Sequence, residues 1–444
     1  MSNNSNYNVG VFYMPFWYYP GTDPMQGNWN AINNYDTFLV NKGEANKARI
    51  PANIYYPSPQ WYDEKMPSVT SSQLQLMSEH EIDFVVFNSY WSYYPAGGFY
   101  APSYNNPIEN LKSANFDFHN VKFALSWAND FTALVSNSGS EAFFDYGGLN
   151  AMIDYWKTFV NNPDPNNHIS DNYLTIDGKK VFYIYYPSTT IGNVNGVGTT
   201  DSIEGMCGYN KNDPFFAPLG ADANEPYINN KKTKFLLDYI ETRMGCPMYF
   251  VAVITPPLRG SGDPTNVDYI LKYDWLVQHP QLAGYSAVTT YGYKYFEYED
   301  AYNTYNTTLC NNAVSPLKWS YDYSVMQSIY QRFYDYMINN SSLDYHVPVT
   351  AGFDRGPLNL QEISNANAAD CNDYKRDPVD QADSTPATFQ QSLSNAKSVV
   401  DNNNAKTKGI VLISAWNEYS EGTVIEPTYT WGTQYLDAVK TVFQ

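Results

Sequence analysis

The feature that most constrains this chain is a series of eight short apolar runs, each of the length of one buried strand. The runs are rich in β-branched and aromatic residues and are nearly continuous, which is typical of parallel strands covered on both faces. In chain order they are Val9–Trp17, Phe84–Trp91, Val121–Trp127, Lys180–Tyr186, Met248–Thr255, Ala283–Thr289, His346–Phe353 and Gly409–Trp416.

Helical periodicity lies between most of these runs, and parallel strands that follow one another need such crossovers. The helical segments are Ser71–Glu81, Gly148–Val160, Lys234–Met244, Asn266–Val277, Tyr323–Ile338, Thr388–Val400 and Thr433–Phe443. We therefore predict an α/β fold, a (β/α)8 barrel with long βα loops, formed by residues 1–444 as one domain. A doubly wound open sheet is the alternative. The barrel is favoured because the clearest chemical motif follows the last strand, where barrel sites gather.

Composition excludes several classes of partner. The net charge of -19, with 26 Lys and Arg, repels phosphate backbones and anionic membrane surfaces, so we expect no nucleic acid or membrane partner. The polar N-terminus shows no leader; a secreted, periplasmic or cell-surface protein whose leader has been removed is preferred, with the cytoplasm as the alternative. The four Cys and five His show no metal-ligand spacing, and no glycine-rich nucleotide motif occurs. We expect a monomer without metal or cofactor.

Aromatic content is unusually high, with 42 Tyr, 23 Phe and 10 Trp. Flat apolar rings with a polar tip suit sugars, although most of them are expected to be core. Polar and aromatic side chains at the strand ends would meet around one mouth of a barrel. The candidate substrate-binding residues are Tyr13, Trp17, Trp91, Trp127, Asn129, Asp354, Arg355 and Asn417. For Asp354 with Arg355 an internal ion pair is the preferred alternative. Asn417 can also orient Glu418, or it can equally cap its loop.

The end of the eighth run carries the catalytic candidates, Glu418 and Glu421, in the sequence WNEYSEG. Glycoside hydrolysis needs one carboxyl group to protonate the leaving oxygen and a second carboxylate to act as base or nucleophile. Two glutamates three residues apart after a strand fit that requirement. The alternative is a pair of surface glutamates beside a loop, because this spacing alone is common.

The segment 410–436, IVLISAWNEYSEGTVIEPTYTWGTQYL, resembles the closing motif of glycoside hydrolase family 99 and of the family-99-like proteins of capsule and O-antigen loci. Blocks at 9–19, 124–129, 173–185 and 349–357 look similar to other blocks of that family and occur in the same order. The block around the second run departs from the pattern. Glu81 stands where the family has its first glycine, and the second glycine is absent.

The resemblance implies an endo-acting, retaining hydrolase that cleaves an α-linked, mannan-like polysaccharide or oligosaccharide. It assigns Glu418 to the sugar 2-hydroxyl and Glu421 to general acid/base catalysis, through a 1,2-anhydro sugar. Two alternatives stay open. One is a surface-polysaccharide-processing or glycosyltransferase-associated protein, and the other is a non-catalytic carbohydrate-binding barrel.

Overall fold

The computed structural model describes part of the chain. The described residues are 7–17, 29, 32–37, 51–52, 62–94, 99–128, 135–138, 141–144, 146–162, 164, 168–185, 228–254, 284–291, 323–353, 357 and 382–444.

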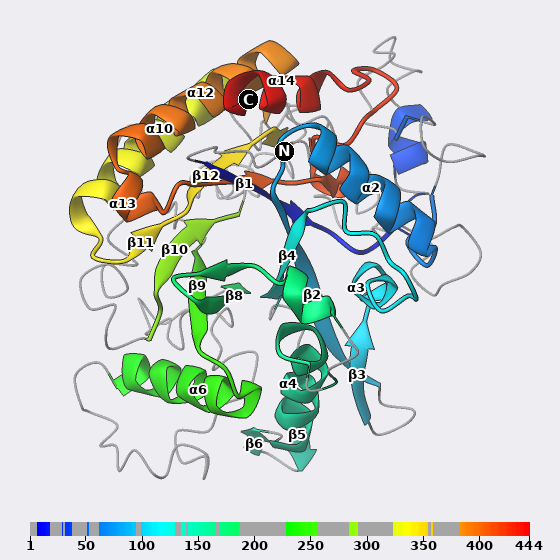
Figure 1. Cartoon of the computed structure of the whole chain (residues 1–444), viewed down its shortest axis with the longest axis vertical. Coiled ribbons are helices and arrows are strands. Elements are labelled where there is room, and N and C mark those ends of the chain that lie inside the picture. Colours follow the sequence, from blue (N-terminus) through cyan, green and yellow to red (C-terminus); the bar gives the residue numbers. More distant parts are fainter. Residues whose placement is uncertain are drawn as a thin grey trace, which may run out of the picture.

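The centre of the molecule is a parallel sheet that closes on itself (Figure 1). Its strands are β1 (Asn8–Tyr13), β2 (Phe84–Tyr94), β4 (Lys122–Trp127), β8 (Lys179–Tyr185), β9 (Met248–Ile254), β10 (Ala287–Thr290), β11 (Asp344–Tyr345), β12 (Val347–Thr350) and β15 (Ile410–Ser414). Each strand is parallel to its neighbour in the order β11, β10, β9, β8, β4, β2, β1, β15, β12.

Closure takes place at the seventh predicted strand, His346–Phe353, which contains β12; β11 lies just before it, and the single residue His346 separates the two. β11 pairs with β10, through Ala287 and Asp344, and β12 pairs with β15, through Val347 and Val411. One stretch of chain thus joins both ends of the sheet. The eight predicted strands form, and the (β/α)8 barrel is confirmed.

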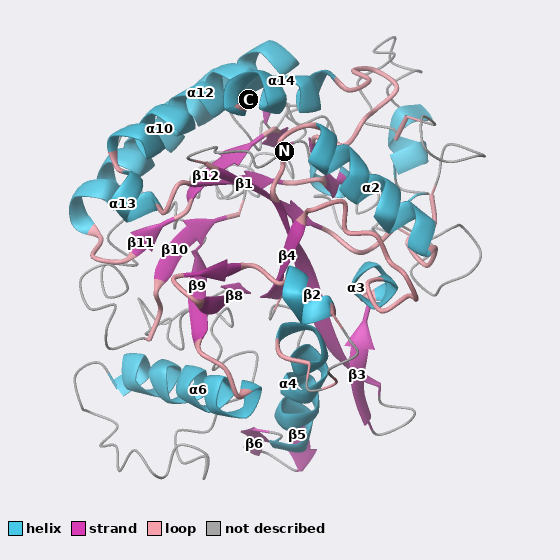
Figure 2. Ribbon diagram, viewed as in Figure 1, coloured by secondary structure: helices cyan, strands magenta, loops and turns pink. Residues whose placement is uncertain are grey.

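Helices surround this sheet (Figure 2). The main ones are α2 (Pro67–Glu79), α3 (Asn106–Asn110), α4 (Tyr146–Val160), α6 (Ile228–Met244), α10 (Tyr323–Asn340), α12 (Pro386–Asn402) and α14 (Gln434–Phe443). Their starts follow known signals. Pro67 opens α2. Thr385 caps α12: its hydroxyl accepts a hydrogen bond from the Thr388 amide, and the Thr388 hydroxyl accepts one from the Thr385 amide. The predicted helix Asn266–Val277 lies outside the described residues.

Shorter elements decorate the barrel. They are β3 (Phe99–Ser103), β5 (Val135–Ser138), β6 (Glu141–Phe144), η2 (Ile169–Asn172), β7 (Thr175–Ile176), β13 (Gly352–Phe353), β14 (Ala382–Asp383), α13 (Asn404–Thr407), β16 (Asn417–Glu418), η5 (Tyr419–Glu421) and β17 (Thr423–Val424). Within the described ranges, no helix has both the length and the apolar character required to span a bilayer.

Aromatic rings fill the barrel interior. Phe12 contacts Tyr183 edge-on at 5.8 Å between ring centroids, and His346 lies between Tyr183 and Tyr249 at 5.8 and 5.9 Å. Close packing of these side chains also requires a residue without a side chain at Gly10. A Cβ at Gly10 would lie 2.1 Å from the Phe84 ring. The interior is therefore a packed core, and any site belongs at its mouth.

Candidate active site at the carboxyl end of the barrel

The Glu418 and Glu421 side chains come from a compact hairpin that begins three residues after β15. Asn417 and Glu418 form β16, which pairs antiparallel with β17, and the η5 turn lies between them. Gly422 ends the turn at φ 65°, a left-handed conformation that glycine adopts without strain. The peptide bond between Ser414 and Ala415, just before the hairpin, is cis. The hairpin therefore keeps both glutamates at the strand end.

Backbone hydrogen bonds hold this hairpin against the barrel. The Trp416 amide donates to the Phe12 carbonyl at 2.7 Å, and the Glu426 amide donates to the Trp416 carbonyl at 2.9 Å. The Ala415 amide donates to the Thr423 carbonyl at 3.1 Å. The site thus rests on the rigid strand framework rather than on a long loop, which favours precise geometry.

The two glutamates differ in exposure. Glu418 is 2% exposed, and its Oε1 accepts hydrogen bonds from the Ser420 amide at 3.2 Å and from the Ser420 hydroxyl. Glu421 is half-buried. Donors from its own turn hold the Glu418 carboxylate, whereas Glu421 keeps contact with solvent.

Tyr291 is a buried tyrosine whose pKa depends on the charges of both glutamates. It follows β10, is 8% exposed, and packs against Phe12 at 5.1 Å and Tyr185 at 5.4 Å. Burial raises the pKa of Tyr291 well above its usual value, and the nearby charges of Glu418 and Glu421 raise it further. The charges of both carboxyl groups therefore act on one buried phenol. Tyr291 was not among the predicted site residues, although its place two residues after the sixth predicted strand was a usable signal.

Asn417 is fully buried and serves the framework. Its Oδ1 accepts from the Met14 amide at 2.9 Å, and its Nδ2 donates to Glu64 Oε1 at 3.1 Å and to the Tyr62 hydroxyl at 3.3 Å. These contacts orient the residue that precedes Glu418. These contacts fit the role of orienting Glu418, and a direct contact between Asn417 and a sugar stays a prediction.

Tyr13 does not lie at the mouth as predicted. It is 1% exposed, and its hydroxyl donates to Gln73 Oε1 of α2 at 2.8 Å. Side chains alternate along a strand, and because Phe12 points into the barrel, Tyr13 points outward to the helix layer. The prediction that it binds substrate is corrected accordingly.

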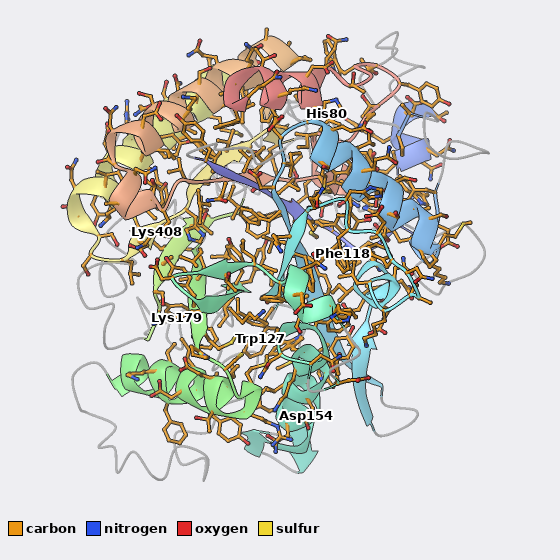
Figure 3. The ribbon with its side chains drawn as sticks, in the orientation of Figure 1. His80, Phe118, Trp127, Asp154, Lys179 and Lys408 are labelled. Atoms are coloured by element: carbon orange, nitrogen blue, oxygen red, sulfur yellow. The ribbon has the colours of Figure 1, made fainter. Side chains whose placement is uncertain are left out.

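The three predicted tryptophans are buried rather than displayed as a stacking floor. Trp17, Trp91 and Trp127 are 0%, 4% and 1% exposed. Trp17 packs against Trp29 at 4.3 Å, and Trp127 (Figure 3) packs against Trp156 at 5.5 Å. All three stabilise the layers beneath the mouth in this structure. The expectation of an open aromatic floor built from them is not met.

Three further predicted site residues, Asn129, Asp354 and Arg355, lie outside the described residues. Where side chains are described, no group of three His, Cys, Asp or Glu residues is placed to hold a metal ion. Cys246 is a free thiol, and the other cysteines fall outside the described ranges.

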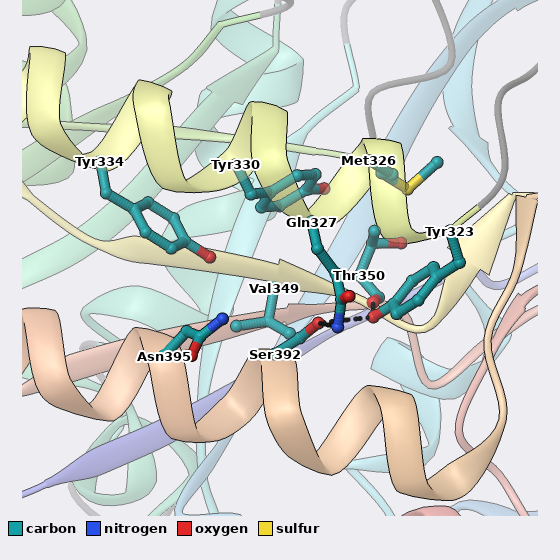
Figure 4. Close-up of a pocket in the computed structure, with 9 residues that line it drawn as sticks. All are labelled: Tyr323, Met326, Gln327, Tyr330, Tyr334, Val349, Thr350, Ser392 and Asn395. Atoms are coloured by element: carbon teal, nitrogen blue, oxygen red, sulfur yellow. Dashed lines mark hydrogen bonds between the residues drawn. The ribbon is translucent and has the colours of Figure 1, made fainter.

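A described crevice lies away from the glutamates, between α10 and α12 (Figure 4). The Tyr323 hydroxyl donates to the Thr350 carbonyl at 2.7 Å and lies 3.0 Å from Ser392 Oγ, while Gln327 Nε2 donates to Ser392 Oγ at 2.8 Å. These groups satisfy one another across the two helices. The crevice is a polar seam of the outer layer, and it offers no group that would act on a glycosidic bond.

Comparison with known proteins agrees with the sequence motif. The model of the family described as "Glycosyltransferase WbsX" matches residues 277–439, which include both glutamates. The resemblance to family-99-like proteins is confirmed. The comparison with curated proteins gives no significant match.

Several solved structures align with this chain along most of their length. A "Glycoside hydrolase-like protein" is 14% identical, with a TM-score of 0.51, and the alignment covers 100% of this chain and 96% of that one. The GH99 endo-alpha-mannosidase from Bacteroides thetaiotaomicron is 11% identical, with a TM-score of 0.43 and coverage of 98% and 96%. The β-glucosidase from Trichoderma harzianum is 9% identical, with a TM-score of 0.45 and coverage of 99% and 97%. At such identities the likeness concerns the fold.

Proposed function

We propose that this protein is a glycoside hydrolase in which Glu418 and Glu421 carry the chemistry. The observation that supports it is that one hairpin holds both carboxyl groups at the end of the barrel where such enzymes work, and that the charges of both act on the buried Tyr291. Glycosidic cleavage needs two carboxyl groups with different roles, and here one glutamate is buried while the other contacts solvent. The family-99-like motif adds the expected division of duties.

In the proposed reaction Glu418 acts on the sugar and Glu421 on the leaving group. Glu418 takes the proton of the 2-hydroxyl while that oxygen attacks the anomeric carbon and forms a 1,2-anhydro sugar. Glu421 gives its proton to the departing glycosidic oxygen. Water then attacks the anomeric carbon and loses a proton to Glu421, and Glu418 returns its proton to the 2-oxygen. Two inversions retain the configuration.

The local contacts suit these duties. Ser420 donates twice to Glu418, which favours the ionised form that a base requires. Glu421 retains solvent contact, so it can exchange protons with water between the two steps. Tyr291, on which the charges of both groups act, carries a hydroxyl that can donate to a sugar oxygen.

For the substrate we propose an uncharged α-linked polysaccharide or oligosaccharide, mannan-like and cleaved internally. The net charge of -19 and the two carboxyl groups at the mouth disfavour glycans that carry phosphate or carboxylate. We also propose that the protein is a monomer, that it acts outside the cytoplasm and that it needs no metal or cofactor. These properties fit an enzyme whose partner is such a polymer.

A second candidate is a glycosyltransferase or another protein that processes surface polysaccharide. The description of the matching family favours it, and the same two glutamates would serve it. The third candidate, a non-catalytic carbohydrate-binding barrel, would not need both glutamates.

One experiment separates the three candidates. Purified protein is incubated with a panel of α- and β-linked glycans, with and without nucleotide sugars, and products are resolved by chromatography. New reducing ends without a nucleotide sugar support the hydrolase, and chain extension supports the transferase. Binding without turnover supports the lectin-like barrel. The double variant Glu418→Gln, Glu421→Gln is the control for contaminating activity.

A further inference from the structure

The turn that carries the two glutamates rests on a second hydrophobic cluster, separate from the core of the barrel. The buried members of this cluster come from the chain up to the first turn of α2 and from the hairpin, and they are Trp17, Trp29, Ile32, Tyr62, Val69, Tyr419 and Val424. Tyr419 stands between Glu418 and Glu421 in the chain, and its ring lies 5.1 Å from that of Trp17 and 5.3 Å from that of Trp29. Tyr419 therefore anchors the turn between the two glutamates.

This anchor ends on a buried carboxyl group, that of Glu426. The Tyr419 hydroxyl donates to Glu426 Oε2 at 2.7 Å. Glu426 is 4% exposed and follows the end of β17 by two residues, and its amide donates to the Trp416 carbonyl at 2.9 Å. Trp416 precedes β16, whereas Tyr419 lies in the turn between the two short strands. Glu426 thus joins the tip of the hairpin to its base.

The same carboxyl group is also linked to the other side of Glu418. The Tyr62 hydroxyl donates to Glu426 Oε2 at 2.9 Å and accepts a hydrogen bond from Asn417 Nδ2 at 3.3 Å. Asn417 comes directly before Glu418, and Tyr419 comes directly after it. Both neighbours of Glu418 are therefore tied to one carboxyl group, Asn417 through Tyr62 and Tyr419 by its own hydroxyl.

A helix of the outer layer completes the arrangement. Gln73 Nε2 of α2 donates to Glu426 Oε1 at 2.9 Å, so Glu426 accepts two hydrogen bonds on Oε2 and one on Oε1. A carboxyl group can accept all three, whereas an apolar side chain of similar size can accept none. Because a buried donor without an acceptor costs free energy, these three contacts hold the carboxyl group in one place. The hairpin is thereby fixed to α2 as well.

We propose that Glu426 is a positioning residue of the candidate active site. It holds the backbone on both sides of Glu418 and so fixes the place of the Glu418 carboxyl group relative to that of Glu421. Catalysis depends on the exact placement of reacting groups, and a small displacement lowers the rate strongly. The consequence for turnover rests on the proposed function, whereas the fixing of the turn does not.

The first test needs no substrate. Tyr419→Phe removes the hydroxyl and keeps the ring, and Tyr334→Phe is the matched control, because the buried Tyr334 hydroxyl donates to the Pro348 carbonyl at 2.5 Å, between α10 and β12. Hydrogen–deuterium exchange of the full chain is measured in the peptide that spans residues 415–426. This peptide should exchange roughly fivefold faster in Tyr419→Phe and at the wild-type rate in Tyr334→Phe. An unchanged rate in Tyr419→Phe, or the same acceleration in both variants, would overturn the proposal.

The second test measures turnover on a glycan that the wild type hydrolyses. Tyr419→Phe should lower kcat on the order of tenfold while KM changes less than about twofold, because the turn moves but the sugar contacts remain. Tyr62→Phe, which breaks the indirect link, should act in the same direction, and Tyr334→Phe should leave both constants unchanged. An unchanged kcat in Tyr419→Phe, or an equal loss in Tyr334→Phe, would contradict positioning. Absence of hydrolysis by the wild type would count against the proposed function alone, because the exchange comparison uses no substrate.

The third test separates hydrogen bonding from packing at Glu426 itself. Glu426→Gln keeps one oxygen that can accept from both tyrosine hydroxyls, and Gln73 can turn its amide group over so that its oxygen accepts from the new NH2 group. Glu426→Leu keeps a similar volume but accepts no hydrogen bond. Glu426→Gln should therefore retain most of kcat, and Glu426→Leu should lose at least as much as Tyr419→Phe. Equal losses in the two variants would overturn the proposal. If Glu426→Leu does not fold, a loss in Glu426→Gln as large as that in Tyr419→Phe would do so.

Discussion

At the mouth of the barrel, Glu426 accepts hydrogen bonds from Tyr62, Gln73 and Tyr419, whereas deeper inside, His346 Nε2 meets no partner among the described residues. The second nitrogen of His346 has one partner, the Tyr183 hydroxyl at 3.1 Å. At the mouth, hydrogen-bond donors surround the buried Glu426 carboxylate and stabilise its charge. The interior excludes charge, because burial lowers the pKa of His346 to about 3. Polar groups at the mouth should therefore control turnover, and those of the interior should control stability.

The largest expected effect is on turnover at the mouth. Glu418→Gln and Glu421→Gln remove a titratable group while keeping the shape, and each should lower kcat by roughly 10²–10⁴-fold on a hydrolysed glycan. An activated leaving group should partly rescue Glu421→Gln but not Glu418→Gln, because only the former supplies the leaving-group proton. Glu79→Gln, on the exposed face of α2, is the control. A wild-type rate in either mouth variant would refute the site, and equal rescue would refute the division of duties.

The next expected effect is on stability beneath the mouth. Trp127→Ala removes a buried ring that packs on Trp156, and should lower the free energy of unfolding by about 3–5 kcal/mol. Urea unfolding measures it, with the exposed Tyr429→Ala as the control. If Trp127→Ala instead lost glycan affinity with unchanged stability, Trp127 would be a residue on which the sugar stacks. That result would contradict the contrast between a mouth that controls turnover and an interior that controls stability.

The interior should also show a specific pH dependence. The pKa of His346 is about 3 in the folded protein and about 6.5 in an unfolded chain, so the unfolded state binds the proton first. The contribution of neutral His346 to the free energy of unfolding is fully present above about pH 6.5. It falls by up to roughly 1.4 kcal/mol per pH unit as the pH drops toward 3. His346→Gln should remove this slope.

The measurement is the difference in unfolding free energy between the wild type and His346→Gln across that range. Asp83, whose pKa is raised to about 6 by burial, acts in the opposite direction, since its contribution is lost as the pH rises from about 4 to 6. Because Asp83 is present in both proteins, its effect cancels in the difference. A difference independent of pH would show that His346 titrates normally and that the interior tolerates charge.

The smallest expected effect lies in the outer layer. Tyr323→Phe removes the hydroxyl that binds the Thr350 carbonyl and Ser392, and should cost about 1 kcal/mol of stability. Thermal unfolding measures it, with Gln391→Ala on the exposed side of α12 as the control. A change in turnover larger than the change in stability would give the crevice a part in function that its position does not suggest.

The strands could be predicted because buried parallel strands are nearly continuous apolar runs, and this signal is local. The sixth strand was predicted at Ala283–Thr289, but it is shorter and covers Ala287–Thr290. The eighth strand ends at Ser414 rather than at Ala415 or Trp416. Such shifts are small because hydrophobicity locates a strand better than it locates its ends.

The candidate site was predictable only where one segment carries it. Glu418 and Glu421 lie in a single motif, but Glu64 reaches Asn417 from a distant part of the chain that no periodicity marks. Tyr13 was misplaced because the sequence does not say which face of β1 looks inward. The predicted position of the three tryptophans was wrong because a residue at a strand end can lie near the mouth while its side chain packs under a neighbouring element.

The pairing of β1 with β15 has a consequence for how the molecule is made. The first strand must wait for the last, since Asn8 pairs with Ile410 and its amide donates to Gly409 at 2.8 Å. During translation the barrel therefore stays open until its final segment leaves the ribosome, and contacts of such sequence separation form slowly. The hairpin that bears Glu418 and Glu421 follows that same segment. A ribosome-bound nascent chain should thus acquire its candidate active site in the act of closing, and not before.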